Sequence, residues 1–146
     1  MGRVEKSIEI KARPEKVWEM LALDRHPELN PSDKSVKYTS KVDTPKEKYR
    51  VGASAHVTQD KEEFDIEITE SLENEKIAYC IQGIRGVRNL AMMIILKPIE
   101  EGTRVTAVSD YEMSNLVMKM FNKLVSKALE KDFEKSLNNL KSVLEK

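Results

Sequence analysis

The sequence predicts an α+β domain in which a curved antiparallel sheet packs against one long C-terminal helix. Between about residue 35 and residue 113, apolar and polar side chains alternate and short turn sequences interrupt the alternation, as in antiparallel strands. From about residue 115 onward, apolar residues recur at spacings of three and four, the pattern of an amphipathic helix. A first strand precedes this region, and a helix that starts at Pro14 follows that strand. Because the apolar stripe of the long helix needs a partner, we expect it to lie on the concave sheet and to enclose a mostly apolar space.

The strands are assigned from period-two alternation, which is strictest over residues 64–69. The short turns between them predict sequential antiparallel neighbours, that is, a meander of six strands after the first one. The run from residue 90 to residue 96 is apolar on both faces, so alternation leaves its inward face open. The positions that share a face are Val4, Ile8 and Ile10; Val36, Tyr38 and Val42; Ala53, Ala55 and Val57; Phe64, Ile66 and Ile68; Ile77, Tyr79 and Ile81; and Val105, Ala107, Ser109 and Tyr111.

Two short helices are expected near the N-terminus. Pro14 suits a first helical position, and Asp24 can cap a second helical turn that runs toward Pro31. The long helix is predicted from about residue 115 to residue 144, and we expect Phe121, Leu124, Ala128 and Phe133 to pack into the sheet.

Composition bounds the class of protein. The 25 Lys and Arg residues balance 25 Asp and Glu residues, which argues against a nucleic-acid partner. No apolar run reaches the roughly 18 residues of a membrane span, so no integral membrane segment is expected. A single cysteine, Cys80, fits a reducing compartment and a cytoplasmic location, and we interpret it as a small buried apolar residue. No linker-like stretch divides the chain, so residues 1–146 are predicted to form one domain, and the content of Lys and Glu resembles that of thermophile proteins.

The order of motifs resembles a known family. A strand is followed by Ala12, Pro14, Val17 and Trp18 in the pattern A-x-P-x-x-V-W, then by the meander, by G-T-R-V-T over residues 102–106, and by a long helix. This order is similar to the START-related, polyketide cyclase-like superfamily, which includes plant pathogenesis-related allergens and lipid-transfer domains. The resemblance implies the helix-grip fold, a seven-stranded sheet wrapped round the terminal helix with a hydrophobic tunnel between them. Where the family has a small polar helix cap, this chain has Arg13, a poorer cap.

No catalytic motif stands out. The sequence lacks H-E-x-x-H, G-x-S-x-G, the P-loop and the dinucleotide fingerprint. His26 is expected in a loop, and His56 is expected on the polar face of a strand unless a bulge turns it inward beside a carboxylate. We therefore predict no catalytic residue, no metal and no cofactor.

The implied function is binding or carriage of a hydrophobic small molecule, such as a lipid, an isoprenoid or a polyketide-like compound. Two alternatives stay open: an enzyme of the cyclase or dehydratase kind, and a protein-interaction module such as a chaperone activator or a toxin-like protein. The predicted ligand-binding residues are Phe64, Ile66, Tyr79, Met93, Ser109, Tyr111, Val117, Met120, Phe121 and Leu124. Ser109 and Tyr111 are the candidates for hydrogen bonds inside an otherwise apolar pocket.

Overall fold

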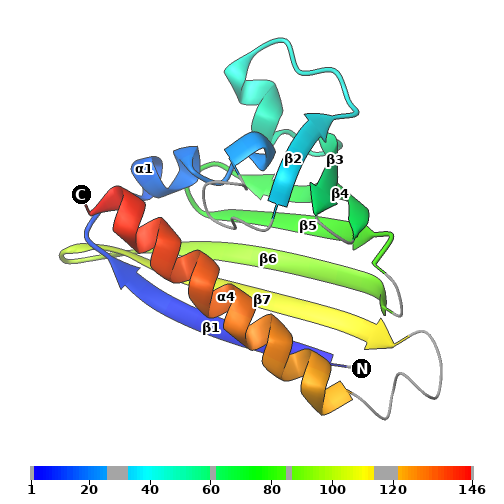
Figure 1. Cartoon of the computed structure of the whole chain (residues 1–146). Helices are drawn as coiled ribbons and strands as arrows, with labels where there is room; N and C mark the ends of the chain where they lie inside the picture. The colour runs from blue at the N-terminus through cyan, green and yellow to red at the C-terminus, as the bar shows by residue number, and fades with distance from the viewer. Residues whose placement is uncertain (1, 26–32, 60–61, 85–86, 114–121, 146) are drawn as a thin grey trace.

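The computed structural model describes residues 2–25, 33–59, 62–84, 87–113 and 122–145. These residues include one antiparallel sheet of seven strands with the order β1-β7-β6-β5-β4-β3-β2. Strands β2 to β7 form the predicted meander, and β1 returns to pair with β7 (Figure 1). The strands are β1 (Gly2–Ile10), β2 (Asp33–Tyr38), β3 (Ser54–Gln59), β4 (Glu63–Leu72), β5 (Lys76–Gln82), β6 (Val87–Ile99) and β7 (Gly102–Met113). The helices are α1 (Pro14–Glu19), the 3₁₀ helices η1 (Leu23–Arg25) and η2 (Pro45–Tyr49), and α4 (Asn122–Leu144). The predicted α+β, helix-grip architecture is confirmed.

The register of the sheet decides which side chains face inward. Directly paired residues of antiparallel strands project from the same face. One such row runs across four strands, from Tyr79 of β5 through Met92 of β6 and Ser109 of β7 to Val4 of β1. The adjacent row, which projects from the opposite, outer face of the sheet, consists of Ala78, Met93 and Val108. The even-numbered residues 90–96 of β6 are therefore on the same face as the inward residues of its neighbours.

Helix α4 lies across the β1 side of the sheet and packs mainly against β1 (Figure 1). Polar contacts fix it there. Lys6 and Glu130 form an ion pair of 2.8 Å, and Lys141 donates a hydrogen bond of 3.1 Å to the carbonyl of Glu9. The second bond engages a backbone group on β1, a strand at the edge of the sheet, where unpaired backbone groups invite pairing with another chain.

Helix α1 and the residues just after it place apolar side chains in the core. Val17, Trp18 and Leu21 are all buried. As expected, Arg13 at the N-cap makes no side-chain capping bond, and Pro14 opens the helix. The ring of Trp18 stacks on Tyr49 of η2 with centroids 5.2 Å apart, which ties the long β2–β3 connection to the helix.

Several element boundaries differ from the sequence prediction. Strand β2 ends at Tyr38, so Val42 falls in the β2–β3 connection, which holds η2 in place of a simple turn. The second N-terminal helix corresponds to η1, which begins at Leu23, one residue before the expected cap. Its expected course toward Pro31 lies outside the described residues. The predicted start of the long helix near residue 115 lies outside the described residues.

The helical stripe was predicted in part wrongly. Leu124 is 64% exposed and Ala128 is exposed, whereas Phe133 is buried as expected. Leu124 precedes Phe133 by nine residues, about two and a half turns at 3.6 residues per turn, and therefore projects from the opposite side of α4. The inward stripe is formed by Leu129, Phe133, Leu137, Leu140 and Leu144, which are buried or packed against the core.

Candidate functional site

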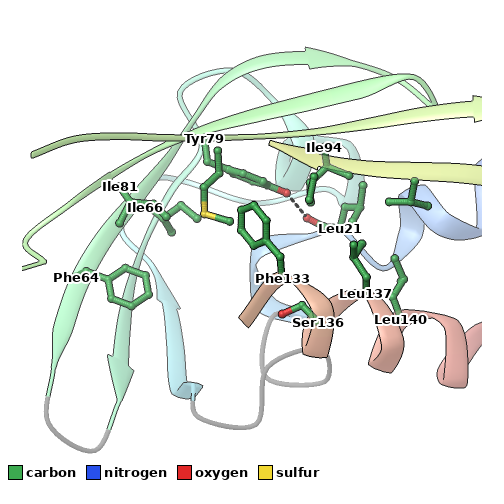
Figure 2. A pocket seen from close by; sticks show the side chains of 13 residues that line it. Leu21, Phe64, Ile66, Tyr79, Ile81, Ile94, Phe133, Ser136, Leu137 and Leu140 are labelled. Atoms are coloured by element: carbon green, nitrogen blue, oxygen red, sulfur yellow. Dashed lines mark hydrogen bonds between the residues drawn. The ribbon is translucent and has the colours of Figure 1, made fainter. Parts of the chain in front are cut away.

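A cavity of about 140 Å³ lies between α4 and the concave face of the sheet. Figure 2 shows its side chains converging from the strands on one side and from the helix on the other. The lining residues are Leu21, Phe64, Ile66, Tyr79, Ile81, Met92, Ile94, Val105, Ala107, Phe133, Ser136, Leu137 and Leu140.

Local sequence periodicity explains how these side chains meet. Strands β4 to β7 each contribute two residues spaced by two, since alternate residues of a strand share a face. Helix α4 contributes Phe133, Ser136, Leu137 and Leu140, the spacing of three and four that places residues on one face of a helix. Leu21 closes the cavity from the segment between α1 and η1.

The lining is chemically apolar. Tyr79 and Ser136 bring its two side-chain hydroxyls, and no lining residue carries a charged side chain. The hydroxyl of Tyr79 donates a hydrogen bond of 3.1 Å to the carbonyl of Leu21, and burial raises the pKa of Tyr79 far above its ordinary value. This phenol therefore stays protonated at neutral pH. Burying a charge without a partner costs far more than burying an apolar group, so the cavity suits an uncharged apolar occupant.

Three of the predicted ligand-binding residues line the cavity: Phe64, Ile66 and Tyr79. Their role as ligand contacts stays a prediction. Of the others, Val117, Met120 and Phe121 lie outside the described residues.

Met93 and Leu124 were assigned wrongly. Met93 lies on the outer face of β6 as the cross-strand partner of Ala78 and Val108, and its neighbour Met92 lines the cavity instead. The outward Met93 meets the buried apolar side chains of Ala78 and Val108, whereas the outward Ala91 and Ile95 are apolar but exposed. Leu124 projects from the exposed side of α4.

Ser109 and Tyr111 are fully or almost fully buried on the inward face of β7, but they are not among the lining residues. The hydroxyl of Tyr111 forms a hydrogen bond with the hydroxyl of Ser126 on α4. The hydroxyl of Ser109 has no hydrogen-bond partner among the described residues. The hydroxyl of Tyr111 is therefore hydrogen-bonded to α4, whereas the hydroxyl of Ser109 is unpaired among the described residues.

The prediction omitted most of the lining. Ile81, Val105 and Ala107 share faces with residues that were chosen, so strict alternation could have found them. Ile94 lies on β6, where alternation leaves the inward face open. Leu21 could not be found this way, because its position depends on how the α1–η1 segment crosses the sheet.

Of the other candidate groups, His26 lies outside the described residues, and His56 and Cys80 lie away from the cavity. His56 is on the outer face of β3, with Nδ1 2.9 Å from Oδ1 of Asp65 and Nε2 3.7 Å from Oε1 of Glu63. The hydrogen bond to Asp65 raises the pKa of His56 above its ordinary value. Cys80 is only half-buried, so the interpretation of this residue as a buried apolar side chain holds in part.

The described part of the chain offers no candidate for a metal site or for a membrane-spanning helix. No cluster of three or more His, Cys, Asp or Glu side chains there could hold a metal ion. None of the helices there is long and apolar enough to cross a membrane.

The chain is similar to a known protein family in sequence and to many solved structures in fold. A family model described as polyketide cyclase / dehydrase and lipid transport matches residues 1–145. No curated protein sequence matches the chain significantly. Many solved structures do.

Three of these structures show how similar the folds are and how low the sequence identity is. Ara h 8.0201 superimposes with a TM-score of 0.76 at 13% identity, covering 98% of this chain and 97% of its own. The protein XoxI from Bacillus cereus gives a TM-score of 0.75 at 17% identity, covering 99% and 96%. The Aha1 dimer from Colwellia psychrerythraea gives 0.68 at 18% identity, covering 99% and 96%. At these identities the likeness concerns the fold.

Proposed function

The chain belongs to the polyketide cyclase / dehydrase and lipid transport family, within the START-related superfamily, and on this basis we propose that it binds a hydrophobic small molecule in the cavity under α4. One observation carries the proposal: an apolar space of about 140 Å³ with no charged side chain in its lining. An engineered apolar cavity of about 150 Å³ in another protein stays dry and binds benzene, so a space of this size holds a ligand of at least one ring.

Binding or carriage is better supported than catalysis. A cyclase or dehydratase needs a group that accepts or donates a proton near neutral pH. The lining provides two hydroxyls, and Tyr79 stays protonated because burial raises its pKa. His56, whose inward placement would favour the enzyme, lies on the outer face beside Asp65.

The test fills the cavity from the helix side. Ser136→Phe adds a ring at a half-buried lining position, and Ala128→Phe adds the same ring on the exposed side of the same helix. Isothermal titration with benzene should show binding to the wild type and to Ala128→Phe, and none to Ser136→Phe.

Equal binding by all three proteins would place benzene elsewhere and contradict the proposal. The absence of binding to the wild type would contradict it as well. Circular dichroism and the midpoint of urea unfolding establish that both variants are folded under the conditions of the titration.

A further inference from the structure

The hydroxyl of Ser109 is an unusual group in this core. Its side chain is 0% exposed, and its Oγ has no hydrogen-bond partner among the described residues. Leaving such a group unpaired costs about 1–3 kcal/mol, and most buried polar groups in folded proteins have a partner. An unpaired hydroxyl at this place is therefore able to form a hydrogen bond with a group of a ligand.

Ser109 lies next to two residues that line the cavity. It is the next inward residue of β7 after Ala107, and it is directly paired with Met92 of β6. Both of these neighbours line the cavity. Met92 is half-buried, and its unbranched side chain has three rotatable bonds, so it adapts its shape more readily than the branched residues around it.

The neighbouring hydroxyls are already engaged. Tyr79 donates to the carbonyl of Leu21, and Tyr111 is bonded to Ser126. Ser109 differs from both, because neither the donor nor the acceptor capacity of its hydroxyl is used by the described residues.

We propose that the ligand of this cavity carries one uncharged hydrogen-bonding group, a hydroxyl or a ketone, and places it on Oγ of Ser109 as the side chain of Met92 turns aside. This inference rests on the proposed function and specifies its ligand: a compact apolar body with a single polar substituent. A carboxylate or phosphate is disfavoured because no lining side chain is charged and could pair with it.

The experiment uses two ligands of nearly equal shape, toluene and phenol, which differ by a methyl group and a hydroxyl. A phenol is uncharged at neutral pH, since its pKa is near about 10. Their dissociation constants are measured by calorimetry on the wild type, on Ser109→Ala and on Ser136→Ala. Ser136→Ala tests the other hydroxyl of the cavity, on α4. Ser142→Ala, measured alongside, is the matched control, because it removes an exposed hydroxyl of α4 outside the lining.

We expect Ser109→Ala to weaken phenol binding by about fivefold to tenfold, the value of one hydrogen bond, and to leave toluene binding unchanged. Ser142→Ala should change neither. Unaltered phenol binding by Ser109→Ala would overturn the inference while toluene binding upholds the proposed function. A loss of phenol binding confined to Ser136→Ala would also overturn it, since the polar group would then lie against the helix. If toluene does not bind the wild type, the proposed function itself fails.

The stability of Ser109→Ala gives an independent readout. Because the hydroxyl is unpaired in the free protein, its removal should leave the urea midpoint unchanged or raise it. A clear decrease would mean that the hydroxyl has a partner in the free protein and would overturn the inference. Ser109→Cys, which keeps a weak donor of similar size, serves as the second variant and should retain part of the preference for phenol.

Discussion

Leu137 and Leu124 lie on opposite sides of α4, so truncating each to alanine separates the inward face of the helix from the outward one. Leu137 is 6% exposed and lines the cavity, whereas Leu124 is 64% exposed. Leu137→Ala removes three buried carbons, worth about 2.4 kcal/mol at about 0.8 kcal/mol each. The enlarged void adds to this loss, so we expect the free energy of unfolding to fall by about 3–4 kcal/mol. Leu124→Ala should change it by less than about 0.5 kcal/mol.

The assay is urea unfolding followed by circular dichroism at 222 nm, a wavelength that reports helix. Each variant is compared with the wild type at equal slope m, since a change in m would signal a change in the unfolded state rather than in stability alone. If Leu124→Ala costs as much as Leu137→Ala, the helix is rotated relative to the arrangement described above, and the cavity lining contributed by α4 is wrong.

Two other predictions concern the sheet and its turns. Because the hydrogen bond to Asp65 raises the pKa of His56, an NMR titration should give His56 a midpoint above 6.5 and Asp65→Asn should lower it; an unchanged midpoint would exclude the contact. The raised folded pKa means that this pair stabilises the fold below pH 6.5 and that its contribution is lost as the pH rises through the folded value. At Gly102, a Cβ atom would overlap the carbonyl oxygen of Ile10, so Gly102→Ala should destabilise the protein by about 3 kcal/mol or more. Gly52→Ala, at a left-handed position with open space around it, should cost about 1 kcal/mol, and equal losses would contradict the close approach.

Most of the sheet was predictable because one face of the strands carries buried apolar side chains and the other carries polar side chains exposed to solvent. Over residues 64–69 this difference is strict, and β4 and its inward residues Phe64 and Ile66 are confirmed. In β6 the same rule gives no answer, since the outward Met93 meets buried residues of both neighbouring strands. Alternation identifies the inward face only where the outward residues are polar, and in β6 the outward Ala91, Met93 and Ile95 are apolar although they are exposed or half-buried.

The helix was predicted in its type but not in its orientation. Apolar residues at spacings of three and four include both Leu124 and Phe133, although they are half a turn apart on the helix surface. Tracking the angle of each residue from Leu137 would have excluded Leu124. The cavity itself depends on how closely α4 approaches the sheet, which is set by packing and by contacts such as Lys6 with Glu130. Neither is encoded in local periodicity.

The central claim, that a small apolar ligand occupies the space under α4, is tested most directly by nuclear Overhauser contacts between bound benzene and methyl-labelled Ile, Leu and Val side chains. We predict contacts to the methyl groups of Ile66, Ile94 and Leu137, which line the cavity. The exposed methyl groups of Leu72 and Leu124 should give none. Contacts confined to Leu72 or Leu124, or the absence of any contact with the three lining residues at saturating benzene, would contradict the account.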